Sequence, residues 1–181
     1  KIVGAHSVRI TGQGAATKIW APEMAFMIEQ SAGISIDRLA VFAIGKLSAI
    51  HVRTAFGLTL RDLIVATFPN QDLQNAAIEL GGFVLGANIH NNLLISTDGI
   101  RALSEVREAG LVTAAIAIDS NIFACRDAAI KFEGNVAHAL ETRICGNEVI
   151  SAGRVGISLT GLTIPGASVR VTENNLNISG P

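Results

Sequence analysis

Tyrosine is absent from this 181-residue sequence, and tryptophan occurs once, as Trp20. So few ring side chains argue against an aromatic platform that stacks on sugars. Charged residues are also scarce, at 16% with a net charge of -1, so we expect no binding to nucleic acid or to an anionic membrane surface. No apolar run approaches the roughly 18 residues that a membrane span needs, and no signal-peptide pattern opens the chain.

Apolar residues are abundant, at 49%, and they follow a repeat. In the unit Ile116–Phe123, apolar and outward residues alternate, two turn-like residues follow, and then come Asn, any residue and a final apolar residue. The unit recurs with Asn at 87–94, 142–149 and 169–176, and with Leu in place of Asn at 34–41 and 58–65. Its inward marker residue recurs every 24 to 29 residues, as Ile10, Ile36, Leu60, Ile89, Ile118, Ile144 and Val171.

Each repeat also contains other short apolar-x-apolar units, such as Ile50–Val52 and Ile78–Leu80. Period-2 units punctuated by Gly, Asn and Asp are strand signals, and a coil of about 27 residues that holds three of them indicates a solenoid. A leucine-rich repeat shares the Asn-containing unit and remains the alternative fold. The return segment favours a parallel β-helix, because it is rich in Ile and Val at strand spacing.

The sequence at this level resembles the right-handed parallel β-helix proteins of the pectate lyase-like superfamily, and its opening at Val8–Ile19 is similar to an early coil of such proteins. We therefore predict an all-β fold, a right-handed parallel β-helix of about seven coils, forming a single domain over residues 1–181. Because the chain opens on Lys1 and shows no cap at either end, we expect it to be a piece of a longer protein, or to have its open coil ends covered by a flanking domain or by another copy.

The recurring asparagines are predicted to stack. Parallel coils lie about 4.8 Å apart, so equivalent residues form columns along the rod. Asn92, Asn121, Asn147 and Asn174 would form an amide ladder in a turn whose backbone Asn tolerates, and Leu39 and Leu63 would continue the column. The two cysteines, Cys125 and Cys145, fall at different phases of the repeat, so we expect structural thiols rather than a disulfide or a metal pair.

Catalytic residues are predicted on the row that follows the marker, which holds Asp37, Arg61, His90 and Asp119 on consecutive coils. An imidazole flanked by Arg61 and Asp119 can act as an acid or a base, so His90, Arg61 and Asp119 are the candidate catalytic residues. The alternative is a solvent-facing ladder of alternating charge with no chemistry.

A second outward row holds His51, Glu79, Arg101 and Lys131. Glu79 and Arg101 would form an exposed ion pair worth at most about 1 kcal/mol, or Arg101 and Lys131 would hold the carboxylates of a sugar-acid polymer. Arg143 and Arg170 form an outward basic pair that can share an anion. The candidate ligand-binding residues are thus Asp37, Glu79, Arg101, Lys131, Arg143 and Arg170.

Carboxylates are scattered singly, with no Asp-x-Asp, so we predict no metal site and no cofactor. The calcium-assisted lyase mechanism that the family resemblance implies therefore lacks its ligands. The expected function is a noncatalytic one: a rigid scaffold or polysaccharide-binding module of a larger secreted, cell-surface or phage-type protein. One alternative is a polysaccharide lyase, hydrolase or epimerase that acts on an extended glycan. The other is a leucine-rich-repeat surface for a protein partner, which would contact Ser35, Thr59, Asn88, Ala117, Arg143 and Arg170.

Overall fold

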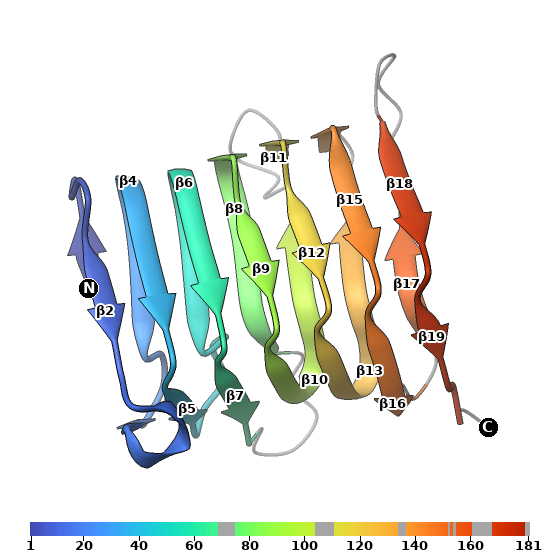
Figure 1. Cartoon of the computed structure of the whole chain (residues 1–181), viewed down its shortest axis with the longest axis horizontal. Coiled ribbons are helices and arrows are strands. Elements are labelled where there is room, and N and C mark those ends of the chain that lie inside the picture. Colours follow the sequence, from blue (N-terminus) through green and yellow to red (C-terminus); the bar gives the residue numbers. More distant parts are fainter. Residues whose placement is uncertain are drawn as a thin grey trace.

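The chain winds into a parallel β-solenoid, seen in Figure 1, a computed structural model that describes residues 1–68, 75–103, 111–133, 137–151, 153, 155–160 and 168–179. Strand accounts for 69% of it and helix for 2%, so the return segments are not helical and the leucine-rich repeat is set aside. From left to right in Figure 1 the front strands run downward and the fainter rear strands run upward, which is a right-handed path. The predicted fold class is confirmed.

Each coil lays strands on three faces. The first face holds β1 (Ile2–Val3), the first part of β4 (Phe26–Asp37), β6 (Ile50–Arg61) and β8 (Ala76–Leu85), the last part of β10 (Leu93–Leu103) and β13 (Ile122–Glu133), and β17 (Val155–Leu159). The second face holds β2 (Arg9–Thr11), the ends of β4 and β6, β9 (Asn88–His90), β12 (Ala117–Asp119), β15 (Thr142–Cys145) and β18 (Val169–Thr172).

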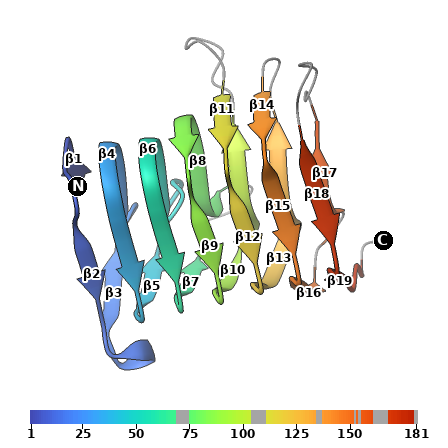
Figure 2. The same ribbon diagram turned by 45° about the horizontal axis from the view of Figure 1, so that its top comes forward.

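The third face holds β3 (Lys18–Ala21), β5 (Ala40–Ala43), β7 (Ile64–Thr67), the starts of β10 and β13, β16 (Glu148–Ser151) and β19 (Asn175–Leu176). The corner between the first and second faces carries β11 (Leu111–Ala114) and β14 (Ala137–Leu140), which pair side by side (Figure 2). A short 3-10 turn, η1 (Gly14–Ala16), precedes β3.

The number of turns differs from the prediction: the solenoid has about five, not about seven. The marker residues do occupy successive rungs of the second face, from Ile10 to Val171. The first and last coils, however, contain the two-residue strands β1 and β19 and therefore pair over a small part of their length. Counting marker residues on one face overestimates the closed turns for this reason.

The interior is filled by the inward residues of all three faces. The markers Ile36, Leu60, Ile89, Ile118 and Ile144 are fully buried, and the ring of Phe123 fills the space behind the third face. Burial of each such side chain stabilises the fold by about 1.5–3 kcal/mol. At the last rung this core is open, because Val171, Leu176 and Ile178 remain exposed. None of the described segments is a helix long and apolar enough to cross a membrane.

The corner between the second and third faces is held by the asparagine ladder, as predicted. Nδ2 of Asn92, Asn121 and Asn147 donates to Oδ1 of the next asparagine at 2.9, 3.0 and 2.8 Å. The same Oδ1 atoms also accept the backbone N–H of the preceding asparagine, as when Asn92 N–H donates to Asn121 at 3.1 Å. Asn92 Oδ1 in turn accepts the Leu63 N–H at 3.0 Å. Leu39 and Leu63 are buried in the same column.

The sharp bend at this corner is made by the residue before each ladder position, whether that position holds Leu63 or an asparagine. This corrects the prediction that Asn itself adopts the turn. Asp62, Asn91, Ser120 and Gly146 have φ of 54°, 57°, 55° and 62°. A left-handed residue directs the chain around the corner, so the next side chain points inward and reaches the coils above and below. The sequence pattern located the ladder but placed the strained backbone one residue too late.

Candidate functional site

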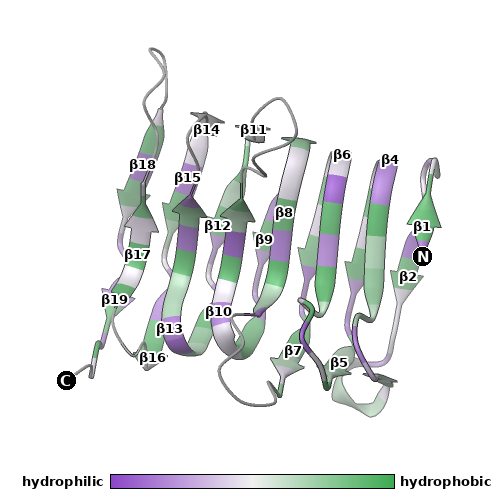
Figure 3. Ribbon diagram, turned by 180° about the vertical axis from the view of Figure 1, so that it is seen from behind, coloured by the Kyte–Doolittle hydropathy of each residue, from purple (hydrophilic) through white to green (hydrophobic). Residues whose placement is uncertain are grey.

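A row of polar side chains crosses the first face, where Figure 3 shows hydrophilic bands on neighbouring strands. Register pairs His51 of β6 with Glu79 of β8, Glu79 with Arg101 of β10, and Arg101 with Lys131 of β13. Each is flanked in sequence by buried residues, so each points away from the core. The predicted stacking of this row is confirmed.

Glu79 is the centre of the row. Its Oε2 accepts hydrogen bonds from Arg101 Nη2 at 2.6 Å and Ser48 Oγ at 2.8 Å, and its Oε1 lies 3.2 Å from His51 Nδ1. Burial alone would raise the pKa of Glu79, but the hydrogen bonds from His51, Arg101 and Ser48 lower it to about 2. Glu79 is therefore a fixed anion, with its lone pairs directed at groups of the same chain.

The expected exposure of this ion pair is wrong, since the side chains of Glu79 and Arg101 are only 15% and 13% exposed. Long side chains stacked about 4.8 Å apart cover one another, an effect that the alternation of a single strand does not reveal. Because the pair is largely desolvated, losing one partner leaves a buried charge and destabilises more than the loss of an exposed pair would.

Asp98, a residue that sequence reasoning missed, lies on the other side of Arg101. A register shift between Ser96 and Asp98 turns this carboxyl beneath the surface, where it is fully buried. Its Oδ1 accepts the Ala128 N–H at 3.2 Å, whereas its Oδ2 makes no hydrogen bond and lies 3.8 Å from Arg101 Nη1. Burial raises the pKa of Asp98, against the opposing charges of Lys131 and Arg101.

The end of the row is also paired within the chain. Lys131 Nζ lies 3.0 Å from Glu133 and 3.9 Å from Asp127. Burial would lower the pKa of Lys131, but the hydrogen bond to Glu133 and the nearby carboxylates raise it. Lys131 thus stays charged and is held by two carboxylates of its own strand.

On the second face, Asp37 is not part of a solvent-facing ladder, because its side chain is fully buried. Its oxygens lie 3.1 Å from Arg9 Nε and from Arg38 Nε, and Thr11 donates a further short hydrogen bond. These contacts, led by the Thr11 hydroxyl, lower the pKa of Asp37 to about 2 against the effect of burial. Arg9, Thr11 and Arg38 therefore surround this carboxylate, and none of them belongs to the row of outward residues in which Asp37 was predicted.

The predicted triad has the expected backbone placement but different partners. Arg61 and His90 are register partners, as are His90 and Asp119. Arg61 Nη2 lies 3.9 Å from Asp37, and Asp119 accepts two hydrogen bonds from Arg143, one of them at 3.2 Å from Nε. Arg61 and Asp119 thus have partners other than His90, whereas acid–base catalysis requires hydrogen-bond reach between the groups involved. The catalytic role of His90, Arg61 and Asp119 stays a prediction.

Arg143 and Arg170 are register partners on β15 and β18, and both side chains are exposed. They line a shallow pocket of about 150 Å³ with Glu141, Thr142 and Ser168. Hydrogen bonding to Asp119 raises the pKa of Arg143. Two guanidinium groups on adjacent rungs can chelate a carboxylate or another oxyanion.

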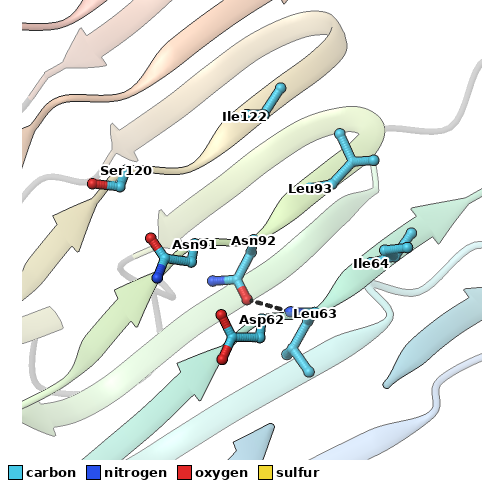
Figure 4. Close-up of a pocket in the computed structure, with 8 residues that line it drawn as sticks. All are labelled: Asp62, Leu63, Ile64, Asn91, Asn92, Leu93, Ser120 and Ile122. Carbon is cyan, nitrogen blue, oxygen red and sulfur yellow. Dashed lines mark hydrogen bonds between the residues drawn. The ribbon is translucent and has the colours of Figure 1, made fainter. Parts of the chain in front are cut away.

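A second pocket runs along the corner between the second and third faces (Figure 4). One wall consists of the polar corner residues Asp62, Asn91 and Ser120, and the other of Ile64, Leu93 and Ile122. On the same third face, the Trp20 ring stacks on Phe42 with centroids 4.5 Å apart, and Trp20 is 62% exposed. No pattern in the sequence indicates this ring pair, because the two residues are brought together only by the register of β3 and β5.

The described residues contain no group of three His, Cys, Asp or Glu side chains placed to hold a metal ion. Both cysteines are free, Cys125 in the core and Cys145 half-buried. The fold and these surfaces define an all-β parallel solenoid. No protein-family model, curated protein or solved structure matches the chain. The β-solenoid agrees with the predicted β-helix, and the resemblance to the pectate lyase-like superfamily stays a prediction.

Proposed function

We propose that this solenoid is a noncatalytic, rigid module of a larger secreted, cell-surface or phage-type assembly. The observation that carries the proposal is that the carboxylates of the first and second faces are neutralised by cations and hydroxyl groups of the rod itself. Glu79 is held by Arg101, His51 and Ser48, and Asp37 by Arg9, Arg38 and Thr11. Groups bound in this way stiffen the stack of coils and are not available to transfer protons.

The low pKa values of both carboxylates support this proposal. A general acid or base is most effective when its pKa lies near the working pH, and the pKa values of Asp37 and Glu79 are lowered to about 2. The raised pKa of Asp98 is closer to that requirement, but the carboxyl is fully buried under its own strand and cannot reach a polymer on the surface.

An assay on polysaccharides tests the proposal against the enzyme alternative. The protein is incubated with a panel of acidic polysaccharides, and unsaturated uronic products are followed by ultraviolet absorbance and new reducing ends by a colorimetric reaction. We expect neither signal. An activity that His90→Ala abolishes, while the circular dichroism spectrum is unchanged, would overturn the scaffold proposal and favour catalysis by His90 with Arg61 and Asp119.

A second candidate function is binding of an extended acidic polysaccharide along the second face. The observation that favours it is the pair of exposed guanidinium groups of Arg143 and Arg170 on adjacent rungs, beside a pocket. Such groups form charge-assisted hydrogen bonds with the carboxylates of uronic acids. Glu79, Arg101 and Lys131, also predicted to bind ligand, support this candidate less, because their side chains are 13–15% exposed, whereas Arg143 remains 57% exposed although it pairs with Asp119.

Affinity electrophoresis through gels that contain a uronic-acid polymer or a neutral glucan tests this candidate. We expect retardation only by the acidic polymer, reduced by added salt and lost in Arg143→Ala/Arg170→Ala. Lys46→Ala is the control, because it removes an exposed charge elsewhere on the surface. Equal retardation of the double variant and the control would rule out the arginine pair as the binding site.

A further inference from the structure

The third face is an apolar sheet surface. Two columns of outward positions run along it, and between the second and fifth rungs every member of both is apolar. Two of these members, Ala40 and Ala66, are covered by their neighbours and are only 1% and 2% exposed. The first column is Lys18, Ala40, Ile64, Leu93, Ile122 and Glu148, and the second is Trp20, Phe42, Ala66, Ile95 and Ala124. Trp20 is 62%, Ile122 38% and Ile150 51% exposed, and continuous apolar patches of this kind mark interaction surfaces.

The only charges in the two columns lie at opposite ends of the first one. Lys18 stands on the first rung and Glu148 on the sixth, and both begin a strand of the third face, at the same level across it. They are roughly 24 Å apart along the rod, five steps of coil spacing. If two copies meet through this face with their rods antiparallel, Lys18 of each copy lies opposite Glu148 of the other. With the rods parallel, the two residues stay five rungs apart.

Side-chain sizes along the columns show the same complementarity. The twofold axis of such a dimer runs along the strand direction, between the third and fourth rungs. It places the second rung of one copy opposite the fifth rung of the other, and the third opposite the fourth. Ile64 then meets Leu93, and the small Ala40 meets the large Ile122. In the second column the large Phe42 meets Ala124, and Ala66 meets Ile95. A large residue faces a small one at three of these four positions, and at the Phe42–Ala124 position both side chains are partly exposed. Ala40 and Ala66 are only 1% and 2% exposed, so Ile122 and Ile95 lie over positions that this chain already covers.

We propose that the third face is a self-complementary interface through which two copies of this chain form an antiparallel dimer. Each copy places Lys18 opposite the partner's Glu148 at both ends of the contact, and the apolar columns between them exclude water. The four-residue strands make the contact roughly 24 by 13 Å, or about 300 Å² per copy, which is below the area of standard specific interfaces. We therefore expect a weak, transient dimer with a dissociation constant in the upper micromolar range. The proposal does not depend on the scaffold function, because an enzyme could dimerise through the same face.

Sedimentation equilibrium over about 1–500 μM tests the dimer, a range that spans the micromolar affinity expected of a small interface. We expect the wild-type protein to pass from monomer to dimer, and Ile122→Glu to stay monomeric at every concentration. Phe56→Glu is the matched control, because Phe56 is an exposed apolar residue of β6 that lies off this face. A wild-type protein that stays monomeric, or a control that abolishes dimerisation as fully as Ile122→Glu, would overturn the proposal.

Charge reversal tests the antiparallel orientation. Lys18→Glu and Glu148→Lys should each raise the dimer dissociation constant about tenfold, since each places like charges together at both ends of the interface. The double variant restores the opposite-charge pairs and should recover the wild-type value, whereas Arg170→Glu, a reversal on the second face, should have no effect. A double variant that dimerises no better than the single variants would overturn the antiparallel arrangement.

Discussion

The side-chain amide of Asn121 donates to Oδ1 of Asn147 at 3.0 Å and to the backbone oxygen of Ile89 at 2.9 Å, so one buried residue connects three consecutive coils. Its own Oδ1 accepts both the backbone N–H and Nδ2 of Asn92. All hydrogen-bonding positions of this amide are thereby used within the rod. The ladder is the element that makes each coil depend on its neighbours.

Replacement of Asn121 by alanine is expected to lower the free energy of unfolding by about 3 kcal/mol, because the buried N–H of Asn92 and the oxygen of Ile89 lose their partners. Asn121→Leu should destabilise almost as much, although Leu63 shows that leucine fits this column. Urea denaturation followed by circular dichroism measures the change. Asn175→Ala, an exposed position of β19, is the control. Equal stability of Asn121→Ala and the control would show that the ladder contributes nothing.

The ladder and the marker residues could be predicted because their spacing is a property of the chain alone. Burial of Asp37 could not, since Arg9, Arg38 and Thr11 meet it only after two coils are placed in register. Burial of Asp98 could not be predicted for a related reason. A register irregularity, which an alternating pattern does not reveal, turns its side chain inward. The Trp20 and Phe42 pair likewise depends on which residues of unequal coils come opposite one another.

Ala115 is expected to be a destabilising residue that glycine would improve. It has φ of 53° in a column of left-handed residues in which the coils below have Gly33, Gly57 and Gly86 at 64°, 65° and 69°. A side chain with a Cβ is strained in this region, so Ala115→Gly should raise the free energy of unfolding by about 1 kcal/mol.

The reverse substitution, Gly86→Ala, provides the matched control. A Cβ there would lie 3.7 Å from the nearest atom, an ordinary contact, so strain of the backbone is the main effect. We expect a loss of about 1 kcal/mol, measured by the same urea titration. If Ala115→Gly and Gly86→Ala shift the free energy of unfolding in the same direction, backbone strain does not explain the effect of either substitution.

Acid is expected to destabilise the rod through Asp37 and Glu79. Their pKa values are about 2 in the fold, below the ordinary 3.8 and 4.5, so the unfolded chain takes up protons first as the pH falls. The stability that these carboxylates contribute is complete above about pH 4.5 and is lost as the pH approaches 2. Thermal melts between pH 7 and 2 should show this decline, and Asp37→Asn and Glu79→Gln should flatten it while lowering stability at pH 7.

Asp98 should behave in the opposite sense. Because its pKa is raised by burial, protonation favours the fold, and its contribution is lost as the pH rises through the raised value. Asp98→Asn keeps an acceptor for the Ala128 N–H and removes the buried charge, so we expect the variant to be more stable than the wild type at pH 8. The difference between the two melting curves should shrink at acidic pH, and a variant that is less stable at every pH would contradict this assignment.

The two thiols are expected to differ sharply in reactivity. Burial raises the pKa of Cys125 to about 12, and its Sγ lies in the core within 3.9 Å of Ser96 Oγ, whereas Cys145 is half-buried on the second face. The thiolate is the reactive form, so at pH 8 a disulfide reagent should label one thiol per chain in the folded protein and the second only as the coils open. Cys145→Ser should remove the fast phase, and Cys125→Ser should retain it. Rapid labelling of both thiols in the wild type would contradict this prediction. It would mean that the coils around Cys125, at the fourth and fifth rungs of the third face, separate readily despite the continuous asparagine ladder beside them.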